Sequence, residues 1–160
     1  MSEPEEIKIE CPNCRKRQKV IVWRAINATL DPELKKELLC GRINFFRCEK
    51  CGIEGYMPID LLYHDMEREF VVQYIPFEWL NQNEVLDEFT EKGYIDIERD
   101  LTIWLGGIES LKDKFWSMVP DDHHFKRIHP VFDMNELIHY VIFRDRLFEQ
   151  RQSGKNRDNL

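Results

Sequence analysis

Four cysteines are arranged in two pairs whose spacing suits a bound metal ion. Cys11 and Cys14 form the first pair, in the sequence CPNC, and Cys48 and Cys51 form the second, in CEKCG. A C-x-x-C turn presents two sulfur atoms from one tight loop, so two such turns that face each other complete a tetrahedron of thiolates, the ligand set that structural Zn²⁺ favours. We therefore predict one structural zinc ion per chain, bound by these four residues.

The other established chemistry of a C-x-x-C pair is a redox dithiol, which normally follows a strand and opens a helix. Neither pair has that context, since strand-like segments flank both. The 33 residues between the pairs exceed the roughly 15–20 of an ordinary zinc ribbon, and an inserted strand and helix account for the excess. Four thiolates leave no position for water, so the predicted zinc is not catalytic. Cys40 is left over and is expected to be a small buried side chain.

The segments around the cysteines have the patterns of short strands. Alternation and β-branched or aromatic content predict strands over 6–10, 20–26, 43–47, 53–59 and 69–75, with turns at 15–19 and 63–68. One helix is predicted between the cysteine pairs, over 31–41. Asp31 can cap it, Pro32 suits its first position and Gly41 suits its end.

The rest of the chain has helical periodicity. Apolar residues recur at helical spacing over 83–93 and 100–119, although Gly106 and Gly107 interrupt the second run. A last helix is predicted to begin at Asp133, where Glu136 completes a capping box. Residues 151–160 contain a single large apolar side chain and are predicted to be a disordered tail.

These elements predict an α+β fold. Residues 1–76 are expected to form a zinc-ribbon-like antiparallel sheet with an inserted helix, and residues 77–150 a mostly helical region packed on or beside it. Within the first part, CPNC, the segment NATLDPELKKELLCG, the second C-x-x-C-G and the segment LLYHD together resemble the CpXC family of bacteria and archaea. The resemblance implies a zinc-ribbon-like fold with Cys11, Cys14, Cys48 and Cys51 as ligands. One departure is Arg15, where family members often have glycine. The resemblance implies no activity.

The charge of the chain is unevenly distributed. The formal net charge is −7, yet residues 11–51 carry ten Lys and Arg against four Asp and Glu, while residues 52–122 carry five against seventeen. No apolar stretch is long enough to cross a bilayer, and the acidic N-terminus is unlike a secretory or mitochondrial leader. We therefore expect a soluble, cytoplasmic protein without a membrane partner.

Two classes of partner fit the basic cysteine segment. Arg15, Lys16, Arg17 and Lys19 could contact a phosphate backbone, as zinc ribbons in nucleic-acid-binding or ribosome-associated proteins do. Alternatively, these charges solvate a turn, face the acidic part of the chain or contact a protein. The acidic net charge favours a protein partner or complex, with the tryptophans of the helical part as core or as interface residues: Trp79, Trp104 and Trp116.

Other candidate catalytic or metal-binding residues are few. His123, His124 and His129 lie in one polar stretch beside Asp121 and Asp122, which suits either a second metal or acid–base site or a solvated loop. His64 and Asp65 are expected in a hairpin turn, and His139 on the surface or core face of the last helix. The sequence contains no phosphate-binding glycine loop and no nucleophile elbow, so a non-catalytic binding or regulatory module is expected rather than an enzyme.

Overall fold

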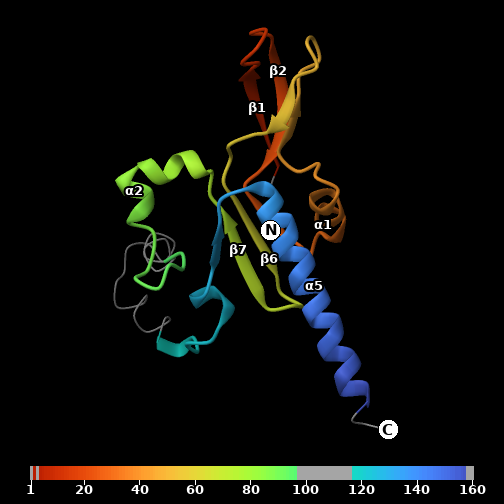
Figure 1. The fold of residues 1–160 in the computed structure, drawn as a ribbon, viewed down its shortest axis with the longest axis vertical. Helices are drawn as coiled ribbons and strands as arrows, with labels where there is room; N and C mark the ends of the chain where they lie inside the picture. The colour runs from red at the N-terminus through yellow and green to blue at the C-terminus, as the bar shows by residue number, and fades with distance from the viewer. Residues whose placement is uncertain (1, 3, 97–116, 158–160) are drawn as a thin grey trace.

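The chain has a mixed α+β architecture in its computed structural model, which describes residues 2, 4–96 and 117–157 (Figure 1). Two antiparallel hairpins, β1 (Pro4–Glu10) with β2 (Arg17–Trp23) and β4 (Phe45–Arg47) with β5 (Glu54–Tyr56), lie at one end. The body contains a four-stranded sheet in the order β3 (Ala25–Asn27), β6 (Leu61–Asp65), β7 (Phe70–Tyr74) and β8 (His129–Val131).

The pairing in the body differs from the mostly antiparallel sheet that the sequence predicted. β3 is parallel to β6 and β7 is parallel to β8, while β6 and β7 are antiparallel. β8 comes from the part of the chain expected to be mostly helical. β7 and β8 are therefore neighbours in one sheet, although they lie on opposite sides of residue 76, where the sequence placed the end of the zinc-ribbon-like part.

Two of the predicted turns were also misplaced. The turn expected at 15–19 is shorter, because β2 already begins at Arg17. The turn expected at 63–68 is largely strand, because β6 continues to Asp65 with buried residues at alternate positions. The hairpin turn between β6 and β7 is thereby confined to Met66–Glu69.

The strand predicted over 20–26 is divided at Arg24 between two sheets. The side-chain amide of Asn44, which is 2 % exposed, replaces a strand partner there. The Trp23 N–H donates to Asn44 Oδ1 at 2.8 Å, and Asn44 Nδ2 donates to the Trp23 carbonyl at 2.7 Å. These two hydrogen bonds, which we call the amide clamp, satisfy the backbone N–H and carbonyl of Trp23 at the point where the chain passes from the hairpin to the body.

The helix predicted between the cysteine pairs is present as α1 (Pro32–Leu39). Pro32 occupies its first turn, but the Asp31 side chain makes no capping hydrogen bond. Gly41 ends the helix with a φ of 71°, and a Cβ at this position would lie 2.8 Å from the Tyr56 hydroxyl. Glycine is therefore required there both by conformation and by close approach.

The C-terminal elements match the sequence in part. The 3₁₀ helix η1 (Phe77–Asn81) and α2 (Asn83–Leu86) are short, so the helix predicted over 83–93 is wrong beyond Leu86. Instead, Phe89 pairs with Ile95, which also pairs with Ile128 and is buried. Residues 97–116, with Trp104, Gly106, Gly107 and Trp116, lie outside the described residues, so the helix predicted over 100–119 is described only at its end.

The last helix, α5 (Met134–Arg157), begins as predicted and ends later. Asp133 Oδ1 accepts hydrogen bonds from the N–H groups of Asn135 and Glu136, and Glu136 reaches back to the N–H of Phe132. α5 continues through residues 151–157, which the composition assigned to a disordered tail. Figure 1 shows α5 running beside the four-stranded sheet and extending past it.

Three apolar clusters form the core. The body cluster lies between the sheet, α1 and α5, and includes Leu38, Tyr63, Val72 and Leu137. Alternate residues of β7 face the opposite side of the sheet, where Val71 and Ile75 pack with Ile95 and Ile128. The hairpin cluster contains two of the cysteines; its buried members are Cys11, Val22, Phe46, Cys48, Met57 and Ile59.

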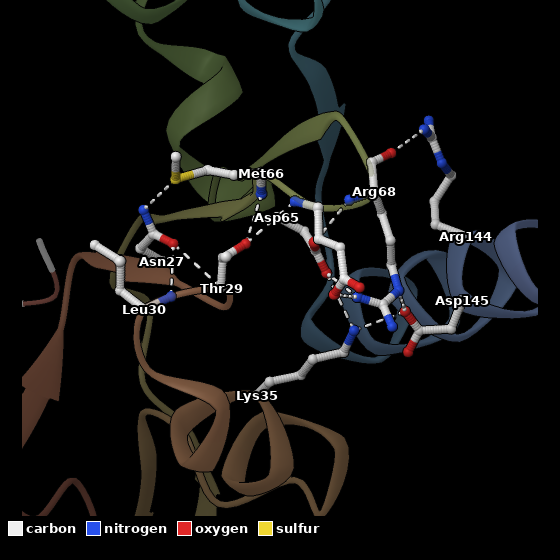
Figure 2. Close-up of polar contacts among 10 residues, drawn as sticks. Asn27, Thr29, Leu30, Lys35, Asp65, Met66, Arg68, Arg144 and Asp145 are labelled. Carbon is white, nitrogen blue, oxygen red and sulfur yellow. Dashed lines mark hydrogen bonds and ion pairs between the residues drawn. The ribbon is translucent and has the colours of Figure 1, made fainter.

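A cluster of charged side chains joins α1, the β6–β7 hairpin and α5 (Figure 2). Lys35 Nζ lies 3.1 Å from Asp65 Oδ2 and 2.6 Å from Asp145 Oδ1. Arg68 contacts the same two carboxylates at 3.4 Å and 2.8 Å. Asp65 is 1 % exposed and also accepts the N–H of Arg68, so the residue expected in a hairpin turn is a buried charge at the end of β6 that pairs with Lys35 of α1 and with Arg68. We call these four residues the charge cluster.

Candidate metal centre

The structure brings the four predicted cysteines together. Their sulfur atoms all lie within 4.8 Å of one another; Cys11 Sγ is 3.6 Å from Cys51 Sγ, and Cys14 Sγ is 3.5 Å from Cys48 Sγ. In a tetrahedral zinc site with Zn–S bonds of about 2.3 Å, neighbouring sulfurs lie about 3.8 Å apart. The spacing therefore fits a metal ion at the centre, and it is much longer than a disulfide bond of about 2.05 Å.

The two cysteine turns have matching backbone geometry. The Arg15 N–H donates to the Cys11 carbonyl at 2.9 Å, as the Gly52 N–H donates to the Cys48 carbonyl at 2.9 Å. Both donors have a positive φ, 57° at Arg15 and 74° at Gly52. Glycine adopts this conformation without strain, whereas arginine does not. The departure from the family pattern at Arg15 thus leaves the turn intact and places a strained residue in it.

The surroundings of the thiols favour thiolate at some positions and thiol at others. The Ile53 N–H and the Asn13 side chain lower the pKa of Cys51 to about 6, and the Cys51 N–H lowers the pKa of Cys48. The Lys16 N–H also favours the Cys14 thiolate, but burial and the neighbouring sulfurs outweigh it and raise the pKa of Cys14 to about 11. Four thiolates at this spacing repel one another, and a bound cation removes that penalty.

The basic side chains beside the cysteines have nearby acidic partners. Lys16 Nζ lies 2.8 Å from a Glu49 oxygen and Lys19 Nζ lies 2.6 Å from a Glu6 oxygen. A third pair, at 3.1 Å, joins Arg17 to Glu10 on the facing strand. The acidic partners of Lys16, Arg17 and Lys19 all belong to the first 51 residues, so among the described residues these three side chains form no ion pair with the acidic segment 52–122. Arg15 forms no ion pair within the described part of the chain.

The histidine stretch divides into two environments. His124 Nε2 lies 3.2 Å from His64 Nε2, and the His123 ring stacks on His124 at 4.2 Å. His129 lies apart, in β8, with its ring stacked on Tyr140 at 4.4 Å. Burial lowers the pKa of His64, and burial together with the neighbouring histidines lowers the pKa of His124 to about 4. Sequence reasoning missed the partnership with His64, although the apolar alternation in LLYHD signals a strand there.

The described residues contain no second group of potential metal ligands beside the cysteines. Over residues 2, 4–96 and 117–157, only the four cysteines form a cluster of three or more potential metal ligands. Cys40 lies outside that cluster and is exposed, contrary to the prediction of a buried side chain. Trp79 packs against the cluster of Val71, Ile75, Ile95 and Ile128, whereas the other two candidate interface tryptophans are outside the described residues.

An apolar groove of about 410 Å³ lies on the hairpins next to the metal centre. Ile7 and Ile9 of β1 line it together with the continuous segment 53–59, which includes β5. Pro12 of the first cysteine turn also lines the groove, and Glu10 and Glu54 contribute its carboxylates. Ile53 is 42 % exposed in this position. We call this feature the hairpin groove.

The comparisons with known proteins give one match. The family model for the CpXC protein matches residues 9–149, which include the four cysteines, the lining of the hairpin groove except Ile7, and most of α5. Neither a curated protein nor a solved structure matches the chain. Across the described residues, no helix combines the length and apolar character needed to span a membrane.

Proposed function

The chain belongs to the CpXC family, and on that premise we propose that it is a non-catalytic, zinc-stabilised module that binds an extended apolar segment of a partner protein in the hairpin groove. The observation that carries the proposal is the groove beside the four-cysteine cluster. The need for reduced thiolates favours a reducing compartment, and we propose the cytoplasm.

The role proposed for the metal follows from the ligand set. Cys11, Cys14, Cys48 and Cys51 would hold Zn²⁺ with four thiolates, which leaves no position for substrate. The bound ion would supply folding free energy by joining two hairpins whose shared apolar core is small. Its contribution to function is therefore to hold the two walls of the groove in place.

The extended form of the proposed ligand follows from the strands that border the groove. Among the described residues, β1 pairs only with β2 and β5 pairs only with β4, so each strand has an outer edge with unpaired backbone groups. Consecutive residues line the groove, so main chain as well as side chains faces it. A partner strand can add to such an edge and insert alternate apolar side chains. The two carboxylates of the groove, Glu10 and Glu54, already lie 3.1 Å from Arg17 and 3.6 Å from Arg47, so the apolar lining is what favours a partner segment.

Nucleic-acid or ribosome binding through the basic segment has weaker support. Lys16, Arg17 and Lys19 each have a carboxylate within 3.1 Å. Exposed pairs of this kind are weak individually, but the acidic groups offset the local positive charge that a phosphate backbone would require. Of the four candidate residues, only Arg15 is left without such a partner among the described residues.

Selection of peptides by the purified zinc-loaded protein tests the proposal. A display library of extended peptides is screened against the wild type and against Ile53→Glu, which places a charge in the groove. The matched control is Ile21→Glu, because Ile21 is 60 % exposed on β2 and does not line the groove. We expect peptides with alternating apolar residues to be enriched by the wild type and the control and to be lost with Ile53→Glu.

Two further measurements make the result decisive. Zinc content and circular dichroism establish that Ile53→Glu retains the metal and the fold, so a loss of binding reports on the groove. Equal enrichment by all three proteins, or no enrichment by the wild type, would refute the groove as a binding site. Sub-micromolar RNA binding at 0.15 M salt that disappears when Arg15, Lys16 and Arg17 are replaced by Ala would instead favour the nucleic-acid function.

A further inference from the structure

A second, polar pocket of about 400 Å³ lies in the body of the protein, far in sequence from the cysteine hairpins. Its walls are the start of β7, the 3₁₀ helix η2 (His124–Lys126) with the residues around it, and α5. Arginine dominates its charged lining, with Arg68, Arg127, Arg144 and Arg151. We call it the arginine pocket.

Three of these arginines have no carboxylate partner among the described residues. The charge of Arg68 is neutralised by Asp65 and Asp145 of the charge cluster. Arg127, Arg144 and Arg151, by contrast, form no ion pair in the part of the chain that the structure describes. In a protein with a net charge of −7, three such guanidinium groups around one cavity are unusual, because nearby acidic residues normally offset them. Glu69 and Asp122 also line the pocket, yet neither lies within ion-pair distance of these arginines.

The central arginine is held in place by its neighbours. The Arg144 guanidinium stacks on the Phe70 ring at 4.6 Å and donates to the carbonyl of Arg68 at 3.3 Å (Figure 2). It also lies 3.5 Å from the hydroxyl of Tyr140, one helical turn earlier on α5. Arg151 follows two turns after Arg144 and so projects from the same face of the helix. A fixed guanidinium loses little conformational entropy when it binds an anion.

We propose that the arginine pocket binds a small phosphorylated metabolite. Guanidinium groups match the oxygens of a phosphate with paired, charge-assisted hydrogen bonds, which makes arginine the preferred residue for such recognition. Counting Arg127, Arg144 and Arg151 against Glu69 and Asp122, the lining is net positive even with Arg68 neutralised. The volume is that of a small-molecule site, and the two carboxylates can accept hydrogen bonds from hydroxyl or amino groups of the same ligand.

Calorimetric titration of the full-length zinc-loaded protein tests this site. The probes are inorganic phosphate, glycerol 3-phosphate, ribose 5-phosphate and adenosine 5′-monophosphate, with glycerol, ribose and adenosine as the matched unphosphorylated compounds. We expect binding of at least one phosphomonoester at physiological salt and none of its unphosphorylated counterpart. Replacing both exposed arginines, Arg127→Gln with Arg151→Gln, should weaken that binding by about tenfold or more, since each charge-assisted hydrogen bond contributes of the order of a tenfold change in affinity.

The control variant is Arg146→Gln, which removes an exposed arginine of the same helix that does not line the pocket. It should leave the affinity unchanged. Arg144→Lys keeps the charge but loses the planar fork, and it should also weaken binding. Absence of binding by every phosphorylated probe, an equal loss in Arg146→Gln, or no loss in the double variant would overturn the proposal. Tighter binding of citrate than of any phosphomonoester would overturn the phosphate assignment.

Discussion

The hairpins and the body of this protein differ in the side chains that join distant segments of the chain. In the hairpins, four cysteines from two turns converge in a cluster whose apolar core has six buried residues, two of them cysteines. In the body, the sheet and two helices bury a larger core, and the charge cluster lies at its margin. On the proposed function, the hairpins would depend on a bound metal ion for stability, whereas the body has a larger buried apolar core and a charge cluster where α1, β6 and α5 meet.

The largest expected effect comes from breaking the cysteine cluster. Cys48→Ser removes one thiolate, and the free energy of zinc binding in small modules, about 10–16 kcal/mol, is also folding free energy. We expect zinc content to fall well below one per chain and the amides of β1, β2, β4 and β5 to lose hydrogen-exchange protection, while those of β6 and β7 keep it. Cys40→Ser, at the exposed cysteine outside the cluster, should change neither measurement. Full zinc content in Cys48→Ser would contradict the assignment.

The next effect is expected in the body. Asp65→Asn removes a buried charge and leaves Lys35 and Arg68 with one carboxylate fewer between them. Breaking a buried ion pair typically costs about 3–5 kcal/mol, so the free energy of unfolding measured with urea should fall by about 3 kcal/mol. Glu33→Gln, which breaks the exposed pair with Lys36, is the control and should cost less than about 1 kcal/mol. Equal losses in the two variants would show that the charge cluster has no special role.

A smaller effect is expected from pH. The pKa of His124 is lowered from 6.5 to about 4 in the folded protein, chiefly by burial. The unfolded chain therefore binds more protons between pH 6.5 and pH 4, and the stability of the folded state falls as pH falls through this range. We expect His124→Gln to lose less stability than the wild type from pH 7 to pH 5, by about 1 kcal/mol after solvent screening.

The smallest effect is expected at the first cysteine turn. Arg15 has a φ of 57°, which costs about 1–2 kcal/mol for a residue other than glycine, while glycine loses about 0.5–1 kcal/mol more entropy on folding. Arg15→Gly should therefore raise the stability of the zinc-bound hairpins by about 0.5–1 kcal/mol in thermal unfolding. Gly52→Ala, at the equivalent position of the second turn, should lower it. A loss of stability in Arg15→Gly would mean that the arginine side chain contributes more than its strained backbone costs.

The cysteine cluster was predictable from sequence because each pair is defined by local spacing and the two pairs need only to meet. The same holds for the Asp133–Glu136 cap of α5, which involves neighbouring residues. The break at Arg24 was not predictable, because it depends on the Asn44 amide from a segment 21 residues from Trp23. The structure at Phe89 was not predictable either. Phe89 has helical spacing in the sequence, but it pairs with Ile95, which in turn pairs with the distant Ile128. The parallel pairings of β3 and β8 depend on such distant partners as well.

The amide clamp at Trp23 has a mechanical consequence. Only Arg24 separates β2 from β3, and its guanidinium contacts Glu5 of the hairpin at 3.2 Å and Asp60, just before β6, at 2.6 Å. The Asn44 side-chain amide also hydrogen-bonds the backbone of Trp23, the residue before Arg24. The junction between β2 and β3 therefore contains no flexible linker about which the hairpins could rotate. A protein bound in the hairpin groove would therefore keep a fixed orientation relative to the body and its arginine pocket, because no flexible linker separates the two.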